Sequence, residues 1–449
     1  MKLSRRRFLL VSGAATASFT VGGSVHSQEE TCGAEVPFVI TVQASGAWDP
    51  TFLIDPVAGN AGFTPFSADQ LLSVGQLRYA PHDTTTGVVP YLVGPARADF
   101  FAKHAQRLLV FNGIDNATVS HDVGPRVAFT GATREGLPSI SGLVAGLKGQ
   151  EKPLAMFVAG GFASTGGLVP ITRGGSLTLL RNLASPNRDA IHHESVDVLL
   201  RDATRRRDLR ARGGSSLPRT RLALEKVFAA RSGVVEDQFR QISEVLSKAA
   251  DTGRRNALAD VAAGVLPLMS SGACAAAHLS TGGFDTHDNH DSLTNGHRPA
   301  MLRLLDGLDY IIDAAAADPV LSARGVLIIV ASDFGRTRYN DSGGKDHWPI
   351  TSMLTIGIGP AEKIAGGARV IGATDPSGTN GVTALPVKVS QGKVIVTAPD
   401  DPEGFKLTPA HVHVALRNAL GLCENGAPGD PLKRFRLNVL PQEPLPIRA

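Results

Sequence analysis

The sequence predicts an α/β fold with a mostly parallel central sheet flanked by helices. Six short runs of nearly continuous apolar residues are spread along the chain, as expected for strands that are covered on both faces. Segments with helical periodicity lie between these runs, and alternating strands and helices indicate a parallel sheet. Because ligands of such sheets bind beyond the carboxyl ends of the strands, functional residues are expected in the loops that follow the strands.

The elements are expected in the following order along the chain. The predicted strands cover residues 36–43, 107–112, 154–159, 273–279, 326–331 and 353–358. The predicted helices cover residues 140–147, 234–268 and 298–317, and Leu302, Leu305, Leu308 and Ile312 give the third helix one apolar face. A last helix is expected to start at Thr408, because the proline that follows it suits the first turn of a helix.

The amino terminus has the features of an export signal. Arg5, Arg6 and Arg7 precede an apolar run from Phe8 to Val21, and small residues lead to Ser27. This order is typical of a signal peptide, and the paired arginines resemble the twin-arginine export signal. The run of about 14 residues is shorter than the ~20 needed to span a bilayer. We therefore expect residues 1–27 to be a signal peptide, although a basic amphipathic helix is an alternative.

Export of this kind implies a partner and a location. The partner is the twin-arginine translocation machinery, and the mature chain is expected in the periplasm or outside the cell. No other stretch of the sequence is long and apolar enough for a stable membrane span.

The charge balance argues against a nucleic-acid partner. The 449 residues carry 45 Lys+Arg and 41 Asp+Glu, a net charge of +4. Residues 1–27 contain four basic residues and no acid, so the rest of the chain is balanced. Residues 201–222 hold eight arginines, but no interleaved aromatic residues that could stack on bases. We expect a solvated helical insertion around residues 185–260, with a patch for polyanions or anionic lipid as the alternative.

Acidic and histidine side chains follow four of the predicted strands. Asp49 follows the first strand, the Ser120-His121-Asp122 segment follows the second, Asp285 and His287 follow the fourth, and Asp333 and His347 follow the fifth. Carboxylate oxygens suit hard divalent ions, and zinc and manganese also accept imidazole. The pattern therefore predicts a divalent metal site, with zinc, manganese, calcium or magnesium as the ion.

Two sequence blocks resemble a known family. Gly-Gly-Phe-Asp-Thr-His-Asp-Asn at 282–289, and Ser-Asp-Phe-Gly-Arg-Thr at 332–337 followed by Gly-Gly-Lys-Asp-His-Trp-Pro at 343–349, resemble the signatures of an uncharacterised bacterial family, domain of unknown function 1501. The resemblance covers roughly residues 36–425. Members usually carry a twin-arginine signal and resemble the alkaline phosphatase and sulfatase superfamily in fold. This implies that residues 28–449 form one alkaline-phosphatase-like domain that contains the insertion.

The resemblance also implies roles for individual residues. Asp49, Asp285, His287, Asp333 and His347 would be ligands of two metal ions about 4 Å apart. Ser120 would be the nucleophile, and Arg126 or Arg336 would bind substrate oxygens bidentately. The implied protein is an exported metal-dependent hydrolase of phosphate esters, ahead of sulfate esters.

The sequence also departs from the superfamily pattern. Phe334 follows Asp333 where these hydrolases generally carry a histidine, so one imidazole ligand is missing unless His121, His290 or Asp346 replaces it. The motif that generates the sulfatase nucleophile is absent. A non-catalytic periplasmic protein on the same fold that binds metal, anions or sugars, or acts as a scaffold, is therefore the alternative. The implied partner is a small anionic ester or a glycan.

Overall fold

The computed structural model describes most of the chain. It covers residues 35–84, 87–175, 242–247, 249, 252–422, 431–440 and 444–448, together with five residues between 202 and 210. The predicted signal peptide and most of the arginine-rich segment lie outside the described residues, as do Cys32 and Cys423. No helix among the described residues has the length and hydrophobicity needed to cross a bilayer.

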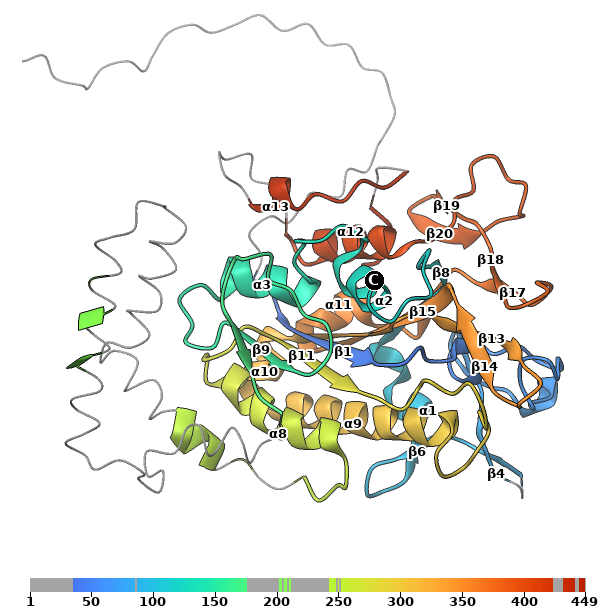
Figure 1. The fold of residues 1–449 in the computed structure, drawn as a ribbon, viewed down its shortest axis with the longest axis horizontal. Coiled ribbons are helices and arrows are strands. Elements are labelled where there is room, and N and C mark those ends of the chain that lie inside the picture. Colours follow the sequence, from blue (N-terminus) through green and yellow to red (C-terminus); the bar gives the residue numbers. More distant parts are fainter. Residues whose placement is uncertain are drawn as a thin grey trace, which may run out of the picture.

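An eight-stranded sheet forms the centre of the molecule and confirms the predicted mixed α/β class (Figure 1). All six predicted strands lie in it, and two short strands are added at its edges. Every neighbouring pair is parallel except the two pairs made by β15. In spatial order the strands are β10 (Ile171–Arg173), β9 (Met156–Ala159), β11 (Ala276–Thr281), β1 (Phe38–Ala44), β12 (Val326–Ser332), β15 (Ile350–Ile358), β8 (Leu108–Asp115) and β16 (Arg369–Ile371).

Helices cover both faces of the sheet, which explains why its strands are predominantly apolar. In β1, Phe38 and Ile40 pack into one core and Val39 packs into the other, because successive strand residues point to opposite faces. Figure 1 shows α8 and α9 below the sheet, and α3 and α12 above it. The main helices are α1 (Phe100–His104), α2 (Gly124–Thr130), α3 (Ile140–Lys148), α8 (Ala257–Ser270), α9 (His297–Ala317), α10 (Pro319–Arg324), α11 (Glu362–Ala365), α12 (Pro409–Ala419) and α13 (Pro431–Arg434).

The helix boundaries follow from capping residues. The side chain of Ser139 accepts a hydrogen bond at the start of α3, and Thr408 forms a capping box with His411 at the start of α12. The predicted helix over 234–268 is confirmed over residues 242–247 and 257–268, but it is interrupted between them. Residues 242–247 are helical, but 252–256 are not, because the side chain of Asn256 accepts from Leu258 and Ala259 and so begins a new helix at Ala257.

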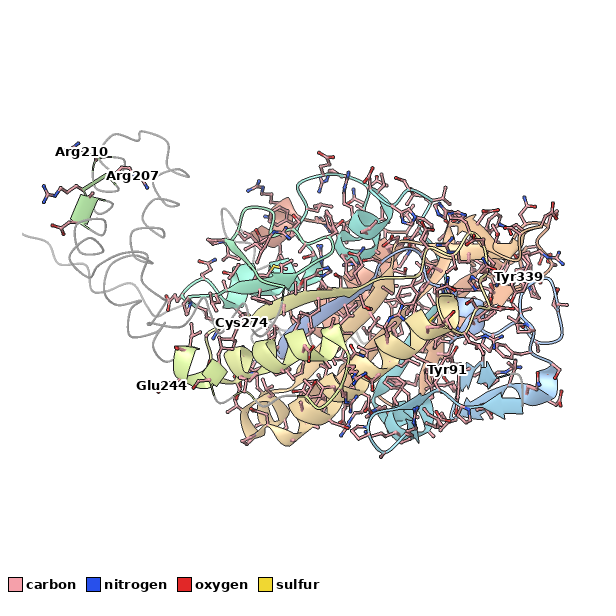
Figure 2. All side chains as sticks on the ribbon, turned by 60° about the horizontal axis from the view of Figure 1, so that its bottom comes forward. Tyr91, Arg207, Arg210, Glu244, Cys274 and Tyr339 are labelled. Atoms are coloured by element: carbon pink, nitrogen blue, oxygen red, sulfur yellow. The ribbon has the colours of Figure 1, made fainter. Side chains whose placement is uncertain are left out.

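The direction of β15 brings one further segment to the functional edge of the sheet. β12 ends at Ser332, the hairpin of β13 (Gly335–Tyr339) and β14 (Lys345–Trp348) follows, and β15 then runs back antiparallel to β12. The hairpin therefore lies at the edge where β1, β8, β11 and β12 end. Figure 2 shows Tyr339 of this hairpin far from Cys274, which precedes β11 and is a buried free thiol, as its apolar surroundings in the sequence predict.

Short hairpins and single-turn helices complete the described chain. The hairpins are β2 (Leu72–Val74) with β3 (Leu77–Tyr79), β4 (His82–Thr84) with β5 (Gly87–Val89), β6 (Leu92–Val93) with β7 (Ala98–Asp99), β17 (Thr374–Asp375) with β18 (Thr383–Ala384), and β19 (Val387–Ser390) with β20 (Lys393–Val396). The 3-10 turns are η1 (Pro50–Phe52), η2 (Ala68–Gln70), η3 (Ala105–Arg107) and η4 (Gly359–Ala361).

Candidate metal centre

Three histidines and one aspartate from three loops converge at the carboxyl edge of the sheet. The Nε2 atom of His347 lies 3.2 Å from Nε2 of His121 and 3.0 Å from Nε2 of His287. Oδ1 of Asp285 lies 3.3 Å from Nε2 of His347 and 3.2 Å from Nε2 of His287, and its Oδ2 lies 3.7 Å from Nε2 of His121. Zn–N bonds of 2.0–2.1 Å at tetrahedral angles place ligand atoms about 3.3 Å apart. We call these four residues the metal centre.

The other nitrogen of each imidazole is already bound to an acceptor. Nδ1 of His121 lies 2.7 Å from Asp333, Nδ1 of His287 lies 2.8 Å from Asp346, and Nδ1 of His347 lies 3.1 Å from the carbonyl oxygen of Val119. Carboxylate and carbonyl oxygens accept hydrogen bonds, so each Nδ1 is the donor, and in the neutral imidazole Nε2 then presents a lone pair. Histidines that bind metals show this same arrangement of donor and outer acceptor.

The backbone geometry of two loops makes the convergence possible. Gly344 of the β13–β14 hairpin approaches the loop after β11 so closely that a Cβ on it would lie 1.9 Å from the carbonyl oxygen of His287. Next to it, the N–H of Lys345 donates to the carbonyl of Thr286 at 3.0 Å. Only glycine permits this approach, which sets His347 of β14 against His287.

Arg336, predicted to bind substrate, is buried beneath the metal centre. Its guanidinium donates to the backbone carbonyls of Ala47, Lys345 and Phe284 at 2.8–2.9 Å and to Oδ1 of Asp285 at 2.7 Å. Burial alone would raise the pKa of Asp285, but Arg336 outweighs it and holds that pKa below its usual value. Arg336 thus keeps Asp285 ionised and oriented toward the imidazoles.

Asp333, predicted to be a metal ligand, stands behind His121. Its carboxylate accepts from Nε2 of Gln43 at 2.9 Å, from the backbone N–H of Gly46 at 3.0 Å and from Nδ1 of His121 at 2.7 Å. Asp346 has the same relation to His287, which holds the pKa of Asp346 below its usual value. Both carboxylates therefore orient a histidine of the metal centre.

Asp49, also predicted to be a metal ligand, lies in a second, fully buried group. Its carboxylate contacts Nζ of Lys345 at 2.5 Å and Nε2 of His290 at 3.2 Å, and its backbone N–H donates to Nε2 of His297 at 2.7 Å. Burial opposes ionisation of Asp49, but Lys345, His290 and His297 together lower the pKa of Asp49. We call Asp49, His290, His297 and Lys345 the lysine-filled cluster, because an ammonium group supplies its positive charge.

The other two predicted residues, Ser120 and Arg126, have no described contact with the side chains of the metal centre. Ser120 is exposed, and its hydroxyl accepts from the N–H of Asp122 at 3.3 Å. It lies between Val119, whose carbonyl oxygen contacts Nδ1 of His347, and His121 of the metal centre. Arg126 in α2 points instead to the carbonyl of Thr133 at 3.0 Å and the carboxylate of Glu135 at 3.2 Å.

His121, one of the three possible replacement ligands, joins the metal centre from the loop after β8. Phe334, which stands where a histidine was expected, packs against His121 and His347 with ring centroids 4.8 Å and 4.5 Å away. The aromatic ring therefore forms a wall of the site, and the imidazole comes from the loop after β8. The signal in the sequence is the Ser-His-Asp segment that follows the second predicted strand.

A third acid and histidine group is internally neutralised. His104, Asp309 and Asp313 lie close enough to hold an ion. Lys103 contacts both carboxylates at 2.7 Å and 2.6 Å, and Arg254 contacts Asp309 at 2.7 Å. These three residues of α1 and α9 therefore form an ion-pair network with Lys103 and Arg254.

Comparison with known proteins gives a family and distant structural matches. Among these matches, a mutant TAB5 alkaline phosphatase with magnesium bound is 12% identical, with a TM-score of 0.32 over 75% of this chain and 94% of that chain. A TM-score this low supports no argument about activity. No curated protein matches the chain. The model of the family described as a protein of unknown function, DUF1501, matches residues 39–391, and the chain therefore belongs to the DUF1501 family.

Proposed function

We propose that the chain binds one divalent ion through His121, Asp285, His287 and His347 and hydrolyses phosphate esters. Sulfate esters are the less favoured substrate class. One observation carries the proposal: Nε2 of His347 lies 3.0–3.2 Å from Nε2 of His121 and of His287, and the Asp285 carboxylate lies 3.2–3.7 Å from all three imidazoles, with His121, Asp285 and His347 close enough together to hold an ion. Acceptors this close repel one another unless a metal ion or an imidazole proton lies between them. Arg336 reaches Asp285 but, among its described contacts, none of the three imidazoles.

The donor set narrows the choice of ion. Three imidazole nitrogens and one carboxylate suit zinc or manganese, whereas calcium and magnesium prefer oxygen ligands alone. Partial burial lowers the pKa of His347, which favours the neutral imidazole that metals require. A divalent ion held here would polarise the phosphoryl oxygen of a bound ester.

Ser120 is the proposed nucleophile. It is exposed on the same short loop as Val119 and His121, and this loop is tied to the metal centre through the imidazoles of His347 and His121. A hydroxyl on that loop is available to a substrate in solvent. The proposal leaves out Arg126 and Arg336, because the described contacts of both guanidinium groups are with protein groups.

Export is part of the same proposal. Arg5, Arg6 and Arg7 stand before an apolar run in the sequence, which supports transport by the twin-arginine machinery to the periplasm or the exterior. Replacing all three arginines by lysine is expected to keep the chain in the cytoplasm. Appearance of this variant outside the cytoplasm at wild-type levels would contradict that route.

A non-catalytic metal-binding protein is the second candidate. This candidate is favoured because the guanidinium of Arg336 donates to backbone carbonyls and is therefore not available to a substrate anion. It is also favoured by the Ser120 hydroxyl, whose described hydrogen bond is to the backbone of Asp122.

Elemental mass spectrometry of the mature chain from Gln28 tests the proposal. We expect about one zinc or manganese ion per chain, lost in Asp285→Asn and His347→Ala. Asp288→Asn is the matched control, since Asp288 is exposed in the same loop and its side chain has no described contact. An aryl phosphate and aryl sulfate screen then follows, in which Ser120→Ala should lose turnover but keep the metal. Absence of metal from every protein after reconstitution would overturn the site, and metal without turnover would favour the second candidate.

A further inference from the structure

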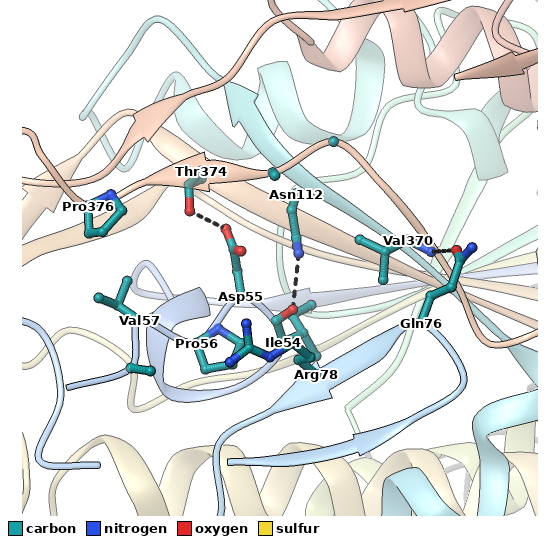
Figure 3. A pocket seen from close by; sticks show the side chains of 13 residues that line it. Ile54, Asp55, Pro56, Val57, Gln76, Arg78, Asn112, Val370, Thr374 and Pro376 are labelled. Carbon is teal, nitrogen blue, oxygen red and sulfur yellow. Dashed lines mark hydrogen bonds between the residues drawn. The ribbon is translucent and has the colours of Figure 1, made fainter. Parts of the chain in front are cut away.

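A cavity of about 370 Å³ lies beside β16, apart from the metal centre (Figure 3). Its volume is in the range of small-molecule sites. None of the four metal-centre residues lines it. The lining residues come from the segment after η1, from β3, from β8 and from the segment after β16: they include Ile54 to Ala58, Gln76, Arg78, Asn112, Val370 and Thr374.

Polar side chains of this cavity have hydrogen-bonding capacity that the described residues leave unused. Asn112 is only 5% exposed, and its Nδ2 donates to the carbonyl of Ile54 at 3.1 Å, but its Oδ1 has no partner. A buried amide oxygen without a partner is costly. Figure 3 shows Asn112 and Asp55 on the same cavity, with Oδ2 of Asp55 accepting from Thr374 at 2.8 Å. Oδ1 of Asp55 has no hydrogen-bond partner among the described residues.

Two donors complete the set. The guanidinium of Arg78 is exposed and makes no direct hydrogen bond or ion pair within the described part of the chain. Gln76 accepts from the N–H of Val370 through Oε1 at 3.1 Å, which leaves its amide NH₂ available for donation. One cavity thus presents two unused acceptors, on Asp55 and Asn112, beside two unused donors.

The chemistry of these groups selects the ligand. The carboxyl of Asp55 disfavours anions and the guanidinium of Arg78 disfavours cations, so a neutral molecule fits best. Hydroxyl groups both donate and accept, as the mixed set requires, and Pro56, Val57 and Val370 offer apolar wall for C–H groups. Burial raises the pKa of Asp55 to about 7, against opposing effects of Thr374 and Arg78, so the carboxyl itself can donate or accept near neutral pH.

We propose that this cavity binds a small neutral polyhydroxy compound, such as one unit of a saccharide. The inference does not rest on the proposed function, because no metal-centre residue takes part.

Binding measurements with a panel of ligands test the inference. Calorimetry and saturation-transfer NMR are carried out on the mature chain with neutral monosaccharides and sugar alcohols, and with carboxylates and amines of similar size. We expect at least one neutral compound to bind, and Asp55→Ala and Arg78→Ala to weaken its binding at least tenfold. Asp400→Ala, at an exposed acid away from the cavity, is the control and should bind as the wild type does.

Two features keep the outcome decisive. Arg78 makes no direct described contact, so Arg78→Ala should fold even if a change at Asp55 disturbs the loop. Chelator-treated protein should bind the compound unchanged, which separates this cavity from the metal centre. Failure of all neutral compounds to bind, binding restricted to carboxylates or amines, or binding that survives both substitutions would overturn the proposal.

Discussion

Two groups of acidic and histidine residues at the same edge of the sheet differ in the source of their positive charge. The lysine-filled cluster is buried from solvent, and Nζ of Lys345 lies among Asp49, the hydroxyl of Thr51 at 3.2 Å and the carbonyl of Phe63 at 2.6 Å. The metal centre is partly open to solvent, and its imidazole nitrogens face one another with no described ammonium group. One group is neutralised by a buried ammonium, whereas in the other Arg336 pairs with Asp285 from one side and no described cation lies between the imidazoles.

The comparison shows that residue type alone does not identify a metal site. His290 and His297 stack with ring centroids 4.4 Å apart, and their Nδ1 atoms share the hydroxyl of Thr286 at 2.7 Å and 3.2 Å. Burial lowers the pKa of both histidines, which makes them neutral packing partners of an ion pair. In the metal centre, outer acceptors fix the protons on Nδ1 and leave Nε2 for a ligand bond.

The largest expected effect comes from removing the internal cation. Lys345→Met leaves Asp49 buried without its ion-pair partner, and breaking such a pair costs about 3–5 kcal/mol. We expect urea denaturation to show a loss of stability of that size. The double variant Lys345→Met with Asp49→Leu removes both charges and should recover part of the loss. A single variant as stable as the wild type would show that Asp49 does not depend on Lys345.

Metal removal should destabilise the metal centre and leave the lysine-filled cluster unchanged. A cation whose free concentration is 100–1,000 times its dissociation constant stabilises the folded chain by about 2.7–4.1 kcal/mol. We therefore expect a chelator to lower the melting temperature of the wild type, and zinc or manganese to restore it. His347→Ala should respond to neither addition. If His347→Ala responded as strongly as the wild type does, the stabilising ion would lie elsewhere.

The outer carboxylates should have a smaller effect. Asp346→Asn and Asp333→Asn each weaken the acceptor that orients a histidine, and changes of this kind typically reduce metal affinity about 10–100-fold. Competition with a chromogenic chelator measures this loss. Asp341→Asn, at an exposed acid in the same hairpin, is the control. Unchanged affinity in both outer variants would mean that the two carboxylates do not support the site.

The sequence was sufficient to predict the strands of the sheet, but not which side chains share a site. β1 and β12 are apolar on both faces, so their residue types already predict burial between helices. The direction of β15 could not be predicted, because an apolar run reads the same in either direction, and this direction returns the hairpin with His347 to the functional edge. Asp49 belongs to a different group from Asp285 because Asp49 pairs with the ammonium of Lys345. Only tertiary packing places Lys345 next to Asp49.

Asp55 is a third acid, and it forms no described ion pair. It should give the smallest of the expected effects. Burial raises its pKa to about 7, above the ordinary aspartate value near 3.9, whereas Lys345 lowers that of Asp49. The folded state therefore holds more protons at Asp55 than the unfolded state between these values, and stability attributable to Asp55 falls as pH rises from about 4 to about 7. Asp55→Asn removes this dependence and keeps an acceptor for Thr374. Thermal denaturation should show wild type and variant nearly equal at pH 4 and the variant higher by a few degrees at pH 8. An equal difference at both pH values would show that Asp55 ionises as an ordinary exposed acid does.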